Sequence, residues 1–316
     1  MKKKKELHVL ITGGAGFIGS NLCHLLLKKG YKLSIIDNLS SGFLDNLNSV
    51  QEKLTFFEKN IEDFDFSNLE NVEAVVHLAA QPSVPLSISQ FGKSSTSNLI
   101  GAIRVIEYCR KRKIPFVYAS SSAVYGNLEM GNDTSSQVEL LSPYAVDKHT
   151  MEVYSKLANQ LYGVSSIGLR FFNVYGPRQD PNNPYSGVIS IFSEKIINRE
   201  PIIINGGHQS RDFVFVGDVV NLIEKSITLS LRTKVCKVSN VLTGTSVTID
   251  ELANELIRLI GNDVDKKYQS LQEGDPLFSK GSTKKMCDFF GVELDRFTSL
   301  ENGLQKTVRF QRFRNL

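Results

Sequence analysis

A tyrosine and a lysine four residues apart have the chemistry needed to remove a proton from a hydroxyl group. They are Tyr144 and Lys148, in the segment Ser142-Pro-Tyr-Ala-Val-Asp-Lys148. Pro143 favours the first turn of a helix, where residues i and i+4 share one face. An ammonium beside a phenol favours the phenolate, so we expect Lys148 to lower the pKa of Tyr144. Alone the spacing is weak evidence, because a chain of this composition contains about one such pair by chance.

Three serines add a hydrogen-bonding group upstream of this pair. Ser120, Ser121 and Ser122 close an apolar run that predicts a strand over residues 115–120. A hydroxyl at the end of that strand could bind the same substrate oxygen as Tyr144. The tyrosine could then take the proton of an alcohol or sugar hydroxyl while a nicotinamide cofactor takes the hydride.

A glycine cluster near the start of the chain is suited to bind such a cofactor. Gly13, Gly16 and Gly19 follow an apolar strand and open a helix, which is the context of a dinucleotide fingerprint. Glycine lets backbone N–H groups approach a pyrophosphate at the positive end of the helix. Asp37 ends the next strand and can accept the ribose hydroxyls, and no arginine follows it to hold a 2′-phosphate. These features predict NAD in preference to NADP; the alternative is a glycine-rich turn that binds nothing.

These residues need a sheet to position them, and the first half of the chain alternates strands and helices. Buried strands are predicted over 7–12, 33–36, 54–57, 74–79, 115–120 and 165–170, and helices over 17–29, 93–112 and 143–162. Continuous apolar strands between helices predict an α/β, doubly wound parallel Rossmann sheet.

After about residue 175 the pattern becomes mixed. A loop rich in Pro and Asn is predicted over 176–187, followed by a short strand at 202–204 and by helices at 188–199, after Val216, and near 248–260 and 299–310. We therefore expect a Rossmann domain over 1–175 and a second, smaller mixed α/β lobe over 176–316, with chain crossovers back to the large domain.

Composition excludes several classes of protein. The 316 residues are 41% hydrophobic and 22% charged, which fits a globular chain and no disordered one. The net charge of +4 equals the contribution of the lysines at 2–5, so we expect a mobile basic tail over 1–6 and a nearly neutral body that binds no nucleic acid. No segment approaches the roughly 20 apolar residues of a membrane span, so we expect no membrane partner. The dispersed Cys and His residues predict no metal site and a reducing, cytoplasmic location.

With these motifs in hand, the chain resembles the extended short-chain dehydrogenase/reductase family, and within it the NAD-dependent nucleotide-sugar 4-epimerases. The resemblance covers nearly the whole chain. It rests on Thr12-Gly-Gly-Ala-Gly-Phe-Ile-Gly-Ser-Asn21, His77-Leu-Ala-Ala80, Ser120-Ser-Ser-Ala-Val-Tyr-Gly126, Tyr144-Ala-Val-Asp-Lys148, Arg170-Phe-Phe-Asn-Val-Tyr-Gly-Pro-Arg178 and Ser210-Arg-Asp-Phe213.

The resemblance implies a role for each site residue. Ser121, Tyr144 and Lys148 would be catalytic, with Tyr144 as the base. Asn60 departs from the aspartate usual in the family, although its amide can still pair with adenine. NAD would contact Gly13, Gly16, Phe17, Ile18, Gly19, Asp37, Asn38, Asn60, Ile61, Leu78, Ala79, Ala80, Asn98, Tyr144, Lys148 and Phe171. The nucleotide sugar would contact Ser121, Ser122, Asn173, Arg178, Val188, Arg211, Asp275 and Phe278.

The resemblance also separates reactions. Similar enzymes that dehydrate a sugar carry Asp-Glu directly after the catalytic Ser or Thr, and those that decarboxylate carry Glu two residues after it. Ser122 and Ala123 stand there instead, so elimination lacks a proton donor. This leaves oxidation at C4, rotation of the 4-keto sugar and return of the hydride, which is C4 epimerisation. The alternatives are another nucleotide-sugar reductase or dehydratase, or a non-catalytic NAD-binding sensor or scaffold.

The sugar itself is less well defined by the sequence. Gln272 stands where the family often has a phosphate-binding arginine, so the nucleotide need not be UDP, although a UDP-sugar is favoured. Phe278 falls near the position that limits the C2 substituent and opposes an N-acetyl group. The segment 178–188, from Arg178 to Val188, instead resembles enzymes that accept N-acetylated sugars. We place UDP-glucose and UDP-galactose slightly ahead of the N-acetyl pair. The resemblance further implies a homodimer formed through the helices near 93–112 and 143–162.

Overall fold

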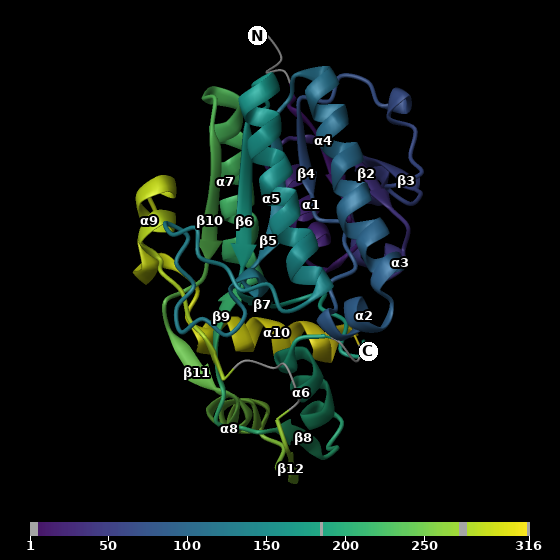
Figure 1. Cartoon of the computed structure of the whole chain (residues 1–316). Coiled ribbons are helices and arrows are strands. Elements are labelled where there is room, and N and C mark those ends of the chain that lie inside the picture. Colours follow the sequence, from purple (N-terminus) through teal and green to yellow (C-terminus); the bar gives the residue numbers. More distant parts are fainter. Residues whose placement is uncertain (1–5, 184–185, 272–276, 315–316) are drawn as a thin grey trace. The chain divides into compact units, whose positions relative to one another are not determined.

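The computed structural model describes residues 6–183, 186–271 and 277–314 (Figure 1). It divides into two compact units, which are described separately. The first contains residues 1–124, 142–170 and 220–239, and the second contains 125–141, 171–219 and 240–316. The chain enters the second unit at Tyr125, Phe171 and Asn240, and it returns to the first at Ser142 and Val220, so the division has several crossovers beside the one near residue 175. The predicted basic tail lies, apart from Glu6, outside the described residues.

The first unit is built on a seven-stranded sheet whose order is β10-β6-β5-β4-β1-β2-β3. The pairs that join β3, β2, β1, β4 and β5 are all parallel. The strands are β1 (His8–Thr12), β2 (Lys32–Asp37), β3 (Leu54–Glu58), β4 (Ala74–His77), β5 (Phe116–Ser121), β6 (Ser166–Phe171) and β10 (Cys236–Val241). Strands β1 and β4 are buried throughout, as expected of a sheet covered on both faces. The doubly wound Rossmann prediction is confirmed.

Helices of the first unit flank this sheet (Figure 1). They are α1 (Phe17–Lys28), α2 (Val84–Ser89), α3 (Phe91–Ser95), α4 (Gly101–Arg112), α5 (Pro143–Tyr162) and most of α7 (Val216–Arg232). The one helix predicted over 93–112 is interrupted, because residues Thr96–Ile100 form a π-helical turn between α3 and α4. Such turns are rare and frequently lie at functional sites. Helix α5 begins at Ser142, whose side chain accepts from Ala145 N–H, with Pro143 in the first turn.

The second unit is a smaller mixed α/β structure. One sheet has β11 (Ser246–Thr248), β9 (Ser210–Phe215) and β13 (Phe278–Ser279) in that order, with β7 (Asn173–Tyr175) also pairing with β9, and β12 (Lys266–Gln269) pairs with β8 (Ile202–Asn205). The helices are α6 (Val188–Ile197), α8 (Ile249–Ile260), α9 (Lys284–Phe290) and α10 (Leu300–Arg314). The sequence patterns predicted three of these four helices and β8, but missed β9, whose neighbours β7 and β13 carry expected substrate residues.

Two negative findings apply to the described part of the chain. Among these residues no helix combines the length and the apolar character needed to cross a membrane. Within the same ranges, no three His, Cys, Asp or Glu side chains gather in a way that would hold a metal ion.

Candidate active site

The glycine loop after β1 is packed too tightly for side chains. Gly13 has a left-handed φ of 73°, and a Cβ atom there would lie 2.7 Å from the backbone nitrogen of Ala79. A Cβ on Gly19 would collide with the carbonyl oxygen of Gly13, and one on Gly16 would lie 3.3 Å from that oxygen. The loop is thus a tight backbone cradle at the start of α1, where a pyrophosphate could approach the positive end of the helix. This geometry fits the predicted dinucleotide. Phe17 and Ile18, in the first turn of α1, are partly exposed beside it.

Asp37 closes the second strand next to this cradle. Its buried carboxylate accepts from Ala15 N–H and Leu39 N–H, both at 2.9 Å. Burial raises the pKa of Asp37, and these backbone hydrogen bonds oppose the rise. The carboxylate is thereby fixed at the end of β2, as ribose recognition requires.

The residues expected at the adenine differ in their surroundings. Asn38 donates to Asn60 at 2.9 Å, and Asn60 donates to Asp63 at 3.1 Å, so the two amides form an exposed chain. The side chain of Ile61 is instead buried in the core and packs against Gly101. Its side chain is therefore part of the packing under α4.

Strand β4 ends in a cluster that the sequence reasoning did not single out. Thr12 Oγ1 accepts from Ala79 N–H at 3.2 Å and shares a second hydrogen bond with His77 Nδ1, 2.7 Å away. Burial, aided by the charge of Lys148, lowers the pKa of His77 to about 3, so its ring is neutral. Thr12 and His77 therefore lock β1 to β4 where Gly13 and Ala79 approach. The polar residue in the otherwise apolar run 74–79 was the available signal.

The loop that follows β4 is fixed by Asn98. Asn98 Oδ1 accepts from Gln81 N–H at 2.7 Å, and its Nδ2 donates to the carbonyl of Gln81 at 3.1 Å. Leu78, Ala79 and Ala80 lie in this loop and are partly exposed. Asn98 stands in the π-helical turn, so the irregular backbone serves to place this buried amide. The structure thus joins Asn98 to the loop, as expected.

The three catalytic candidates come together in the first unit. Tyr144 and Lys148 lie one turn apart on α5, with Lys148 Nζ 5.7 Å from the centre of the Tyr144 ring. Lys148 Nζ donates to the carbonyl of Ala119 at 2.8 Å, which ties α5 to β5. Ser121 ends β5 and hydrogen-bonds the Tyr144 side chain, and its Oγ also accepts from Ala123 N–H at 3.1 Å. The triad predicted from sequence is therefore assembled.

The lowering of the Tyr144 pKa that we expected from Lys148 stays a prediction. The surrounding protein raises the pKa of Tyr144 although its side chain keeps some exposure, and the hydrogen bond with Ser121 is what opposes the rise. Lys148 is itself buried, and burial lowers the pKa of its ammonium to about 8. The ammonium of Lys148 donates to the Ala119 carbonyl. The hydrogen bond from Ser121 is therefore the contact that favours the phenolate of Tyr144.

Residues expected to bind substrate are found on several elements of the second unit. Asn173 Nδ2 donates to the carbonyl of Asp212 at 3.1 Å and lies 3.4 Å from Ser279 Oγ. Arg211 is buried in β9 and donates to the carbonyl of Ser210 at 2.9 Å. Phe278 pairs with Ser210 and is half exposed.

The other expected substrate contacts are more peripheral. Arg178 has a left-handed φ of 71°, and its guanidinium lies 5.5 Å from the centre of the Phe310 ring. Val188 begins α6 and is partly exposed. Phe171, which is expected to contact NAD, is buried at the end of β6. Ser122 opens the 3₁₀ turn Ser122–Tyr125 in the first unit. Gln272 and Asp275 lie outside the described residues.

Comparison with known proteins identifies the family to which this chain belongs. Residues 9–235 match the NAD dependent epimerase/dehydratase family, and the chain belongs to that family. Membership confirms the extended short-chain dehydrogenase/reductase prediction and NAD as the cofactor.

Individual relatives are similar over nearly their whole length. The UDP-glucose 4-epimerase of Mycolicibacterium smegmatis is 33% identical over 98% of this chain and 99% of its own. The solved structure of UDP-N-acetylglucosamine 4-epimerase from Methanobrevibacter ruminantium M1, in complex with UDP-N-acetylmuramic acid, superposes with a TM-score of 0.91 at 35% identity, covering 98% of this chain and 100% of that one. UDP-glucose 4-epimerase from Thermotoga maritima, with UDP-glucose, gives a TM-score of 0.90 at 33% identity and the same coverage.

Proposed function

We propose that this chain is an NAD-dependent epimerase that inverts C4 of a UDP-sugar. The observation that carries the proposal is the assembly of Ser121, Tyr144 and Lys148 beside a glycine cradle, with no acid in the turn after Ser121. The relatives named above, two of them UDP-glucose 4-epimerases and one a UDP-N-acetylglucosamine 4-epimerase, support the same reaction.

The chain's own residues perform the proton chemistry. Tyr144 takes the proton of the C4 hydroxyl, and Ser121 hydrogen-bonds that oxygen and favours the phenolate. Lys148 would donate to the nicotinamide ribose while it anchors α5 to β5. NAD, when bound, supplies reversible acceptance of hydride. If the 4-keto sugar turns over before the hydride returns to C4 and Tyr144 returns the proton to the oxygen, the opposite face of C4 is reduced and C4 is inverted.

The nearby carboxylates argue against dehydration. Elimination of water requires a protonated acid, but Ser122 and Ala123 occupy the relevant turn. Glu152 is paired with Arg170, which keeps the pKa of Glu152 at about 2, so it is ionised. Ser122, Ala123 and the ionised Glu152 therefore supply no acid for elimination.

The residues beside Asn173 bear on the choice of sugar. Phe278 is half exposed, whereas the hydroxyl of Ser279 lies beside Asn173. A small residue next to Asn173 would leave space for a substituent at C2 of the sugar. We therefore propose the N-acetylated UDP-sugars and the pair UDP-glucose and UDP-galactose as equally favoured substrates. Arg211 would bind the nucleotide phosphate.

NMR of the products tests the reaction. Purified protein, with no added cofactor, is incubated with UDP-glucose and separately with UDP-N-acetylglucosamine. We expect the C4 epimer of at least one sugar, and extra ultraviolet absorption of the protein from the adenine of retained NAD. A 4-keto-6-deoxy product, or a stoichiometric need for NADPH, would replace the epimerase proposal with a dehydratase or a reductase.

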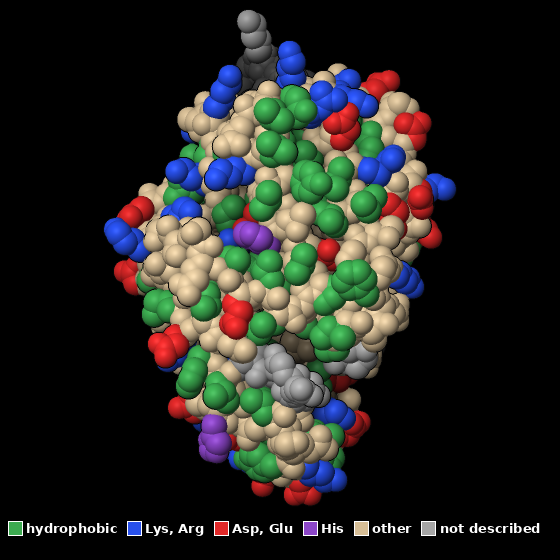
Figure 2. All heavy atoms as spheres, in the orientation of Figure 1, with side chains coloured by type: hydrophobic (Ala, Val, Ile, Leu, Met, Phe, Trp, Pro, Cys, Tyr) green, Lys and Arg blue, Asp and Glu red, His purple; other side chains and the backbone are tan. Residues whose placement is uncertain are grey.

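We also propose a homodimer formed through α4 and α5. Apolar side chains along one side of α5 are exposed, namely Val146, Val153, Tyr154, Leu157, Leu161 and Tyr162. Apolar patches cover the face of the first unit seen in Figure 2. Exposed apolar patches of this kind usually mark an interface.

Light scattering tests the dimer. Leu157→Glu with Leu161→Glu should halve the measured mass, because it places charges on the apolar side of α5. Lys156→Glu, at an exposed charged position on the same helix, should leave the mass unchanged. A monomer in the unmodified protein contradicts the proposal. We also propose a cytoplasmic location, which is consistent with the buried thiol of Cys109.

A further inference from the structure

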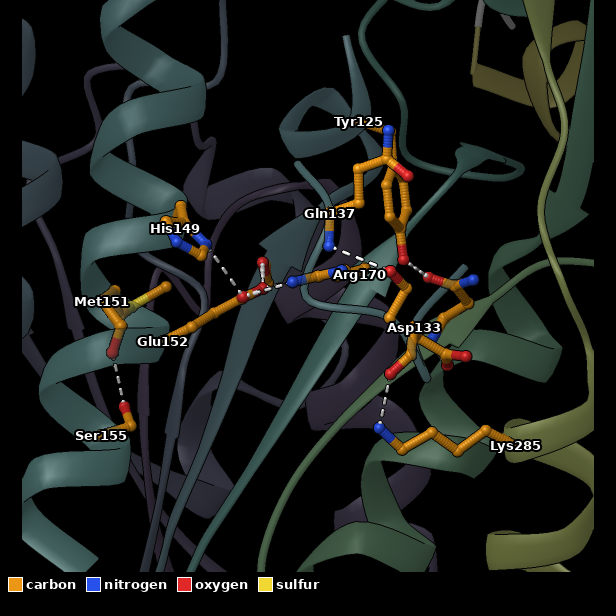
Figure 3. A network of polar contacts seen from close by, with 12 residues as sticks. Tyr125, Asp133, Gln137, His149, Met151, Glu152, Ser155, Arg170 and Lys285 are labelled. Carbon is orange, nitrogen blue, oxygen red and sulfur yellow. Dashed lines mark hydrogen bonds and ion pairs between the residues drawn. The ribbon is translucent and has the colours of Figure 1, made fainter. Parts of the chain in front are cut away.

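A buried carboxylate lies directly behind the catalytic triad. Glu152 stands one turn after Lys148 on α5 and is 6% exposed. Its Oε1 accepts from Arg170 Nε at 2.8 Å and from Ser120 Oγ at 2.5 Å, and its Oε2 accepts from Arg170 Nη2 at 2.6 Å. His149 Nδ1 lies 3.4 Å from Oε2. Figure 3 shows the side chains of His149 and Arg170 directed toward the carboxylate of Glu152.

Each contact joins a different piece of the site. Ser120 directly precedes Ser121 on β5, and Glu152 belongs to the helix that carries Tyr144 and Lys148. Arg170 lies near the end of the neighbouring strand β6. One carboxylate therefore connects the strand of the catalytic serine, the helix of the catalytic tyrosine, and the next strand of the sheet.

Stability alone does not explain a charged pair in this place. Taking two charges out of water costs free energy that their attraction returns only with good geometry, and apolar replacements of such pairs are often equally stable. Tyr118 and Met151, which neighbour the pair along β5 and α5, belong to an apolar core in which aliphatic side chains would also pack. The pair gives instead a directional hydrogen bond to Ser120, which an aliphatic side chain lacks.

Catalysis needs such a fixed direction. A reacting hydroxyl has to be held within a fraction of an ångström, and a misplacement of about 1 Å can cost 100-fold in rate. We propose that Glu152 is a positioning residue, whose hydrogen bond to Ser120 holds the end of β5, and with it the hydroxyl of Ser121, against α5. The role rests on the epimerase function proposed above.

A displacement of Ser121 would change the pKa of Tyr144. Ser121 Oγ accepts from Ala123 N–H at 3.1 Å and hydrogen-bonds Tyr144, and this bond opposes the rise that burial causes in the pKa of Tyr144. When Ser121 moves, that opposition is lost and the pKa of Tyr144 rises. The base then becomes deprotonated only at higher pH, a change that a purely structural role of Glu152 would not produce.

Ser120→Ala isolates this contact, since it removes the hydrogen bond to β5 and keeps the Glu152–Arg170 pair. Ser155→Ala is the control: Ser155 is buried on α5 and donates to Met151 O at 2.8 Å (Figure 3). Its hydroxyl also hydrogen-bonds Tyr118 of β5, so this variant removes an α5–β5 contact that lies before the end of the strand. Ser120→Ala should lower kcat about 10-fold or more with little change in KM. It should also move the acid limb of the kcat pH profile to higher pH. Ser155→Ala should do neither.

Hydrogen–deuterium exchange gives a second readout that requires no turnover. In Ser120→Ala the peptide spanning residues 119–125, with the Ala123 amide, should exchange faster, whereas Ser155→Ala should leave it unchanged. Equal rates, pH profiles and exchange in the two variants would overturn the positioning role. If the unmodified protein fails to interconvert C4 epimers, the proposed epimerase function is wrong. The comparison of exchange rates then still decides whether Glu152 fixes the end of β5.

Discussion

The two units differ in how their candidate site residues are held. In the first unit, Ser121, Tyr144 and Lys148 stand at strand ends and on a capped helix, fixed by contacts such as that of Lys148 with the Ala119 carbonyl. In the second, Phe278 is half exposed on a two-residue strand and Arg178 has a left-handed backbone. The comparison suggests a division of labour. We propose that the first unit fixes the chemistry and that the second contributes binding and selectivity, so their variants should affect different kinetic constants.

Removing the base should have the largest effect. Tyr144→Phe deletes the hydroxyl that takes the proton and should lower kcat by about 1,000-fold, the range expected for loss of a general base. The fold should remain, since the ring stays in place and α5 keeps its Ser142 cap. Steady-state rates and the melting temperature measure both effects. Activity within tenfold of the unmodified enzyme would show that another group removes the proton.

The buried pair in the first unit should make stability depend on pH. The pKa of Glu152 is about 2, below its ordinary value near 4.5, because of its hydrogen bonds with Arg170, His149 and Ser120. A lowered carboxyl pKa adds stability that is complete above pH 4.5 and is lost as the pH falls toward 2. The stability advantage of the unmodified protein over Glu152→Gln should therefore shrink by about 2 kcal/mol between pH 7 and pH 3.

Denaturant unfolding of both proteins across this range gives the comparison. Because every other acidic group is common to the two proteins, its titration cancels in the difference. A constant difference between pH 7 and pH 3 would mean that Glu152 carries no buried charge in the folded state.

A substitution in the second unit should have a smaller effect, confined to binding. Arg211→Met removes a guanidinium expected at the nucleotide phosphate and should raise KM about tenfold, or about 1.4 kcal/mol, with kcat nearly unchanged. Initial rates over a range of UDP-sugar concentrations measure this. A fall in kcat with constant KM would contradict the proposal that the second unit contributes to binding and the first to the chemical step.

Much of the first unit could be predicted because its motifs and its backbone coincide. The glycine spacing predicted a cradle, and the left-handed φ and close contacts of Gly13 supply its physical reason. Strands and helices of the Rossmann sheet followed from uninterrupted apolar runs. The π-helical turn at Thr96–Ile100 could not be predicted, since nothing in the local residue types distinguishes it from an ordinary helix.

Other details depended on tertiary contacts. The i, i+4 spacing placed Tyr144 and Lys148 on one face, but it could not reveal that the ammonium of Lys148 is directed to the Ala119 carbonyl. The second unit was harder to predict, because β7 and β13 are short and are defined only by their pairing with β9. Sequence position alone therefore singled out Phe278, whereas Ser279 is the residue whose hydroxyl lies beside Asn173.

The central claim is that C4 is oxidised and then reduced with its own hydrogen. The most direct test follows UDP-glucose carrying deuterium at C4, and in parallel the unlabelled sugar in deuterated water, with the product analysed by NMR. The account predicts that the C4 epimer keeps the deuterium of the labelled sugar and gains none from the water. Loss of the label to the solvent, or deuterium from water at C4, would contradict it.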